Sequence, residues 1–214
     1  MAGILKVDRI QSDSNLAFAI AGSNVAFMNA TSLQMTSSNI SLGGTNVITN
    51  GKVVTSAQPV GAVLQVVNNT ATTSVSTLNT VGTNYVASGF IVTITPSSAT
   101  SKVLLMCSSC IGNSAGASGM SVLFYRSIGG GGYSAIGSNG LATQYLNNIT
   151  YVSYQVNMFG LNYLDSPGTT SAVSYQLYFQ GNNGSPTGTC YLNGRNNDGL
   201  QQPQLNFTAM EISA

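Results

Sequence analysis

The chain has 214 residues, of which 43% are apolar and 5% are charged, and its formal net charge is +1. An apolar fraction of this size argues against a disordered chain, and so few basic residues disfavour binding to nucleic acid or to a membrane surface. No histidine occurs and Glu211 is the single glutamate, so the commonest general base and metal ligand are missing. The apolar stretch at residues 16–22 is about a third of a spanning helix. We therefore expect no nucleic acid, no membrane insertion, no metal and no cofactor.

A short apolar-x-apolar triplet recurs between residues 16 and 55, with turn-forming residues between its copies. Strict alternation places the two large residues of a triplet on one face of a strand. We interpret these large residues as the core of a repetitive β-shaft: Leu16, Phe18, Val25, Phe27, Leu33, Met35, Ile40 and Leu42.

One such triplet buries too little apolar surface to offset an ordering cost of about 1 to 2 kcal/mol per residue. Each unit therefore needs neighbours, and three chains around one axis would let every triplet face two copies of itself. The alternative interpretation is an ordinary meander or linker at the edge of a monomeric domain.

A boundary is predicted at Gln58-Pro59-Val60-Gly61, because the proline and glycine interrupt regular structure and the pattern changes afterwards. The remaining block is rich in β-branched and aromatic runs separated by Gly, Asn, Ser and Pro. About eight short strands and long polar loops favour an all-β sandwich or jelly roll. The predicted strands include residues 63–67, 90–96, 102–107, 121–125, 151–156, 172–179, 190–192 and 205–212.

Three segments resemble the fibre and virion structural proteins of tailed bacteriophages, particularly those that infect cyanobacteria. They are Met1-Ala-Gly-Ile-Leu-Lys-Val-Asp-Arg-Ile-Gln-Ser-Asp-Ser-Asn-Leu-Ala-Phe18, the run from Gly89 to Leu105, and the terminal run from Leu205 to Ile212. The match covers both parts of the chain.

The resemblance implies a homotrimer with a virion anchor at residues 1–15, an intertwined β-shaft at 16–58 and a globular β-sandwich head at 59–214. It further implies a tail fibre that docks on another virion structural protein through its N-terminus and binds a host surface glycan or protein through its head. Its place would be the virion, after synthesis in the host cytoplasm. A capsid-mounted head fibre or decoration protein, and a short glycan depolymerase, stay open as alternatives.

Enzymatic chemistry is disfavoured by the scarcity of acidic groups. Glycan cleavage needs a pair of carboxylates, and Asp165 and Asp198 both lie in turn-like sequence contexts. The Cys107-Ser-Ser-Cys110 motif has no second CxxC and no histidine to complete four metal ligands, which favours a structural role. The three cysteines of the chain, an odd number, do not suit a disulfide framework. We predict a protein that is not an enzyme.

Binding residues are predicted at both ends of the chain. Four of its eleven charges lie within the first thirteen residues, and charge complementarity gives an anchor its specificity; these candidates are Lys6, Asp8, Arg9 and Asp13. In the head, tyrosines and amides in polar loops are suited to sugars or to a protein partner. The receptor-binding candidates are Tyr133, Tyr145, Asn193, Arg195, Asn196, Asn197 and Asp198.

Overall fold

The structure is a computed structural model of the chain. It describes residues 16–20, 23–28, 33–35, 39–42, 45–49, 52–53, 58–78, 85–113, 119–137, 143–147, 156–181, 189–195 and 203–214. The chain divides into two compact units, Met1–Gln58 and Pro59–Ala214. Each unit is described by itself.

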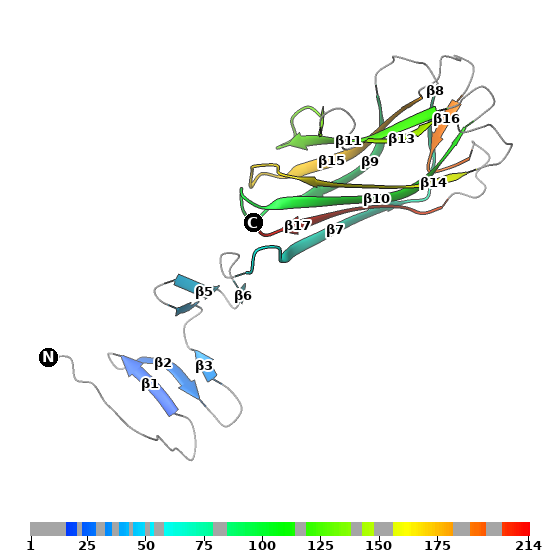
Figure 1. The fold of residues 1–214 in the computed structure, drawn as a ribbon. Coiled ribbons are helices and arrows are strands. Elements are labelled where there is room, and N and C mark those ends of the chain that lie inside the picture. The colour runs from blue at the N-terminus through cyan, green and yellow to red at the C-terminus, as the bar shows by residue number, and fades with distance from the viewer. Residues whose placement is uncertain are drawn as a thin grey trace. The chain divides into compact units, whose positions relative to one another are not determined.

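The first unit holds two antiparallel meanders (Figure 1). One contains β1 (Leu16–Ile20), β2 (Ser23–Met28) and β3 (Leu33–Met35), and the other contains β4 (Asn39–Leu42), β5 (Thr45–Thr49) and β6 (Lys52–Val53). The strands thus pair within one chain, as the meander interpretation describes. Intertwining of three chains stays a prediction.

The register of the first meander shows how the triplets of neighbouring strands lie opposite one another. Leu16 lies opposite Met28, whereas Phe27 lies opposite Ala17 and Gln34. Because opposite positions share a face of a sheet, the large positions of β2 lie on the other face from those of β1 and β3. The triplets therefore do not form one apolar face, and this sheet carries large apolar positions on both sides.

The second unit is an antiparallel sandwich of two sheets (Figure 1). The first sheet has the order β7-β17-β10-β16-β8, with β14 also paired to β10, and the second has the order β12-β11-β15-β9, with β13 paired to β11. Every regular element of the described residues is a strand, in agreement with the all-β prediction. The strands are β7 (Val63–Ala71), β8 (Val75–Leu78), β9 (Val86–Ile94), β10 (Lys102–Asn113), β11 (Gly119–Ile128), β12 (Ser134–Ala135), β13 (Thr143–Asn147), β14 (Asn157–Asp165), β15 (Val173–Gly181), β16 (Thr189–Leu192) and β17 (Leu205–Ile212).

The core lies between the two sheets and follows from strand alternation. In β17 the alternate residues Leu205, Phe207 and Ala209 are buried, and the neighbours between them are more exposed. Phe207 stacks on Phe124 of β11, with ring centroids 5.4 Å apart, and so joins the sheets at their centre. Full burial of each large side chain contributes about 1.5 to 3 kcal/mol, which makes this layer the main source of stability.

A buried polar contact also joins the two sheets. Arg126 in β11 donates from Nη1 to both carboxylate oxygens of Asp165 at 2.9 Å, and Tyr175 in β15 donates from its hydroxyl to Asp165 Oδ2 at 2.7 Å. Asp165 ends β14 of the opposite sheet and is 5% exposed. The contact satisfies a carboxylate that would otherwise be costly to bury.

Candidate functional site

Four half-buried tyrosines form a cluster in the second sheet and its adjoining segments, which we call the tyrosine cluster: Tyr85, Tyr125, Tyr133 and Tyr178. Tyr125 lies in β11 and Tyr178 in β15, where Tyr178 pairs with Leu123 and is therefore the diagonal neighbour of Tyr125. In β15 the residues on either side of Tyr178, Leu177 and Phe179, are buried in the core. Alternation therefore places Tyr178 on the outer face of the sandwich.

The four rings form a row. Tyr125 and Tyr178 stack with centroids 3.8 Å apart and an interplanar angle of 19°. Tyr85 is tilted against Tyr125 at 6.3 Å, and Tyr133 is tilted against Tyr178 at 6.1 Å. Because each central ring covers one face of the other, a ligand would meet mainly the edges and hydroxyls of this pair.

The phenols of the central pair are held in their neutral form. Burial raises the pKa of Tyr125, and the neighbouring Tyr85 and Tyr178 raise it further. Burial also raises the pKa of Tyr178, with a further contribution from Tyr133. A phenol of ordinary pKa is already protonated at neutral pH, and these shifts keep it so at higher pH, so both hydroxyls can donate as well as accept hydrogen bonds.

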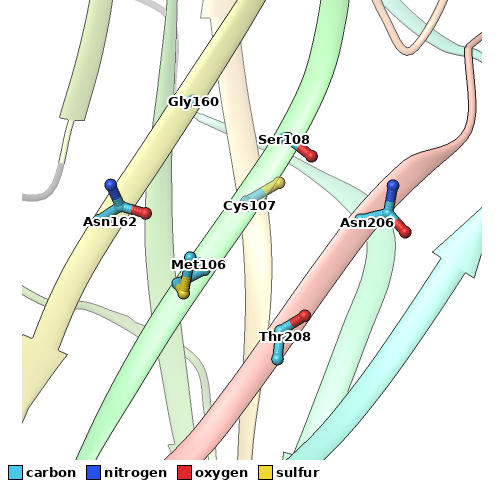
Figure 2. Close-up of a pocket in the computed structure, with 7 residues that line it drawn as sticks. All are labelled: Met106, Cys107, Ser108, Gly160, Asn162, Asn206 and Thr208. Atoms are coloured by element: carbon cyan, nitrogen blue, oxygen red, sulfur yellow. The ribbon is translucent and has the colours of Figure 1, made fainter.

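The first sheet carries a hollow of about 220 Å³ on its outer face, between β14, β10 and β17 (Figure 2). Most of the surface that lines it is apolar, although amide and hydroxyl side chains border it around the side chain of Met106. The lining residues are Met106, Cys107, Ser108, Gly160, Asn162, Asn206 and Thr208.

The hollow exists because small residues meet in one row of the sheet. Ser108 lies between Gly160 and Asn206 in register, and a Cβ atom added at Gly160 would meet nothing within 4 Å. Thr208 is already engaged on one side, since Asn68 donates from Nδ2 to its Oγ1 at 2.7 Å. The hollow is a shallow and mainly apolar depression, without the convergent charged groups of a catalytic pocket.

Two predicted receptor-binding residues belong to the tyrosine-bearing sheet. Tyr133 is half-buried and is a member of the tyrosine cluster. Tyr145 lies in β13, opposite Ser121 of β11, and its side chain is outside the described residues. The strand that carries Tyr145 and the strand that directly follows Tyr133, β12, both pair with β11.

Two other predicted receptor-binding residues are corrected by the structure. Asn193 is fully buried, with a φ of 62°, and its Nδ2 donates to the carbonyls of Ala71 at 3.1 Å and Thr73 at 3.0 Å. Its Oδ1 accepts from Ser109 Oγ at 2.9 Å. Arg195 is 8% exposed. These side chains were expected on a surface loop, but the amide of Asn193 satisfies backbone groups inside the sandwich instead.

The other predicted site residues lie outside the described residues. These are Asn196, Asn197 and Asp198 of the head loop and Lys6, Asp8, Arg9 and Asp13 of the anchor. The shaft-core positions lie in β1 to β4, where the backbone is described and the side chains are not.

The CxxC motif lies within β10, and its thiols are buried and free. Burial raises the pKa of Cys107 to about 12 and that of Cys110 to about 11. In the part of the chain that the structure describes, no three His, Cys, Asp or Glu side chains come together as a metal site. No helix among those residues is long and apolar enough to cross a membrane.

Three members of the tyrosine cluster are not among the predicted receptor-binding residues. Tyr125 and Tyr178 each follow or precede a core phenylalanine in the sequence, which places them on the opposite face of the strand by alternation. Tyr85 carried no comparable signal, because it precedes β9 and reaches Tyr125 only through the pairing of distant strands.

These features define a two-sheet, all-β protein with a partly exposed tyrosine cluster. No family model matches the chain, and no curated protein matches it. Two solved structures of infectious bursal disease virus, of the Gx and Gt strains, are similar at 13% and 12% identity, with TM-scores of 0.34 and 0.36. The matches cover 85% and 88% of this chain but 47% and 45% of the viral chains, so it spans about half their length. At these TM-scores the likeness does not identify a function.

Proposed function

We propose that the protein is a homotrimeric structural fibre of a tailed-phage virion and is not an enzyme. Its N-terminal segment attaches to another virion protein, and its sandwich adheres to the bacterial host surface. The proposal draws on the resemblance of three sequence segments to phage fibre proteins and on the all-β fold. The single observation that carries the adhesive role is the stacked pair of Tyr125 and Tyr178 between two tilted tyrosines.

The tyrosine cluster suits an uncharged ligand, such as a neutral sugar of a surface glycan. Tyrosine supplies a large contact area while losing little side-chain entropy, and its hydroxyl adds a hydrogen bond at the rim. The nearest charged side chain along β11, Arg126, is already engaged by Asp165 on the core side. Recognition by this face therefore depends on ring contacts and hydroxyls.

Adsorption to host cells tests the proposal. Replacing Tyr125 and Tyr178 together by alanine removes the stacked pair, and loss of such a contact of about 2 kcal/mol lowers the binding constant roughly 30-fold. Replacing both by phenylalanine keeps the rings and loses only the hydroxyl contacts, so its effect is smaller. Gln204→Ala, at an exposed position before β17 of the other sheet, is the matched surface control.

The outcomes separate the classes of function. Unchanged adsorption by a folded alanine variant would remove the tyrosine cluster from host binding. Release of reducing sugars from host polysaccharide by the purified wild-type chain would instead favour a depolymerase.

A further inference from the structure

The outer face of β7, β17, β10 and β14 carries an uninterrupted apolar row, which we call the apolar row. Cross-strand register aligns Val66, Met210, Leu104 and Leu164 across these four strands. Val66 is 56% exposed and Leu164 is 49% exposed. Exposed apolar side chains that are scattered singly need no explanation, but a row across four strands indicates a contact surface.

Further exposed apolar residues extend the apolar row along the same sheet. Met106 lies two residues along β10 from Leu104, on the same face, and is 42% exposed. In the opposite direction along the strands, Val63 of β7 pairs with Ile212 of β17. Met158, near the far end of β14, is also exposed. Lys102, beside Ile212 in register, is the charged residue at the margin of this face.

We propose that a second copy of this chain covers this face, so that the apolar row is the contact between heads in the assembled fibre. The inference rests on the proposed homotrimer and adds the surface that the copies share. Its first support is chemical, because a face with one marginal charge cannot recognise a charged partner. A copy of this chain, with 5% charged residues, offers the uncharged counterpart.

The second support is the size of the face. The pairing of β10 with β14 runs over nine residue pairs. Strands about 4.8 Å apart that rise about 3.4 Å per residue make four strands of this length roughly 19 Å by 30 Å, about 570 Å² before side-chain relief. Stable interfaces bury about 800 Å² per partner, so one face of this size supplies most of what a lasting contact needs.

The third support is the position of the face along the chain. The first unit ends at Gln58, and β7 begins at Val63 beside the apolar row. If copies associate through their first units, β7 of each copy begins only a few residues along the chain after the associated unit ends. Such a tether raises the effective concentration of one head for another, and a modest apolar contact then suffices.

The test uses the full chain, with light scattering for mass and hydrogen peroxide as a footprint of the methionines. In Val66→Lys/Leu164→Lys, both lysines enter exposed positions, and the charges oppose contact between copies. We expect Met106 and Met158 to oxidise about fivefold or more slowly in wild type than in this variant, whereas buried Met120 reacts slowly in both. Ile128→Lys, at an exposed apolar position of the other sheet, is the matched control and should keep the wild-type footprint.

Each result decides the inference. Equal oxidation of Met106 in a trimeric wild type and in the lysine variant would show an uncovered face, which overturns this inference and leaves the proposed fibre intact. A monomeric wild type would overturn both. If the lysine variant does not fold, Val66→Thr/Leu164→Gln repeats the comparison without charge, and the same equality of rates would refute the contact.

Discussion

Glu211 in the last strand accepts two hydrogen bonds from Ser97, one from its backbone N–H at 2.7 Å and one from its Oγ at 2.6 Å. Gln65 Nε2 donates to the other carboxylate oxygen at 2.7 Å. Ser97 lies in the turn after β9 and Gln65 in β7, so one buried carboxylate joins three segments distant in sequence. The last strand is therefore tied to β7 and to the turn after β9 by a single side chain.

Glu211→Gln should destabilise the chain at neutral pH and remove one source of its acid sensitivity. Burial acts to raise the pKa of Glu211, but the hydrogen bonds from Ser97 and Gln65 outweigh it and leave the pKa below its ordinary value of 4.5. A lowered carboxyl pKa contributes stability above the ordinary value, and this stability is lost as pH falls through that value toward the folded one. We expect a loss of about 1.5 to 3 kcal/mol at pH 7 in denaturant unfolding.

The pH dependence gives that prediction its control. The stability difference between wild type and Glu211→Gln should shrink as pH falls below about 4.5, because the carboxylate of the unfolded chain then takes up its proton before that of the folded chain does. Gln204→Ala, at an exposed position before the same strand, should shift neither the midpoint nor its pH dependence. A constant difference down to pH 3 would show that Glu211 is not held as a buried carboxylate.

The fold class was predictable because it depends on local patterns. The run Leu205–Ile212 alternates strictly and forms β17 with the same bounds, and most other predicted runs lie within strands. The strand β14 was missed although residues 159–163 alternate, because Gly160 and Asn162 are residues typical of turns and apolar Met158 and Leu164 break the alternation at either end.

The candidate site depended on contacts that the sequence does not display. Asn193 stands in a polar, glycine-containing run that predicts an exposed turn, yet its partners are Ala71, Thr73 and Ser109, between 84 and 122 residues away along the chain. The row of tyrosines arises from the register between β11 and β15, which core packing sets and no short motif records. The amino-acid type indicates that tyrosines are suited to binding, but the strand register decides which tyrosines lie next to one another.

Asn193→Ala should cost the sandwich more than a typical loop substitution. The change removes the two hydrogen bonds to Ala71 and Thr73, leaves Ser109 without its acceptor, and places alanine at a φ of 62°. We expect a loss of about 2 to 4 kcal/mol, since each buried unsatisfied group costs about 1 to 3 kcal/mol. Asn193→Gly loses the same side-chain hydrogen bonds, but glycine adopts this φ without strain. The difference in unfolding free energy between the glycine and alanine variants therefore measures the cost of the backbone strain.

Gly112 in β10 lies against the backbone that follows Asn193. A Cβ atom there would lie 2.5 Å from Arg195 Cα and 2.6 Å from the carbonyl oxygen of Gly194. Gly112→Ala should therefore displace the backbone after Asn193, whereas Gly160→Ala, which meets open space, should be tolerated in the packing. Equal unfolding midpoints for the two alanine variants would contradict the close approach of β10 to this segment.

The three cysteines should be unreactive in the native protein. Burial raises the pKa of Cys107 to about 12 and that of both Cys110 and Cys190 to about 11, so the thiolate that attacks a disulfide reagent is scarce at pH 8. We expect negligible reaction with Ellman's reagent in buffer and three equivalents after unfolding in guanidinium chloride. Rapid labelling of even one native thiol would argue that the CxxC segment opens in solution, and it would reopen a redox or metal-binding role for that segment.

Under the proposed adhesive role, binding of this protein to host cells should resist added salt. Of the charged residues described between 59 and 214, Lys102 is exposed, Arg126 pairs with Asp165, and Glu211 and Arg195 are buried. Screening acts mainly on exposed charges, so the adsorption constant should change by less than about twofold between roughly 50 and 300 mM sodium chloride. Lys102→Ala, which removes the exposed cation from the far sheet, should leave both the constant and its salt dependence as in wild type. A tenfold loss of adsorption over this range would show that ion pairs carry recognition, and the tyrosine cluster would then be the wrong surface.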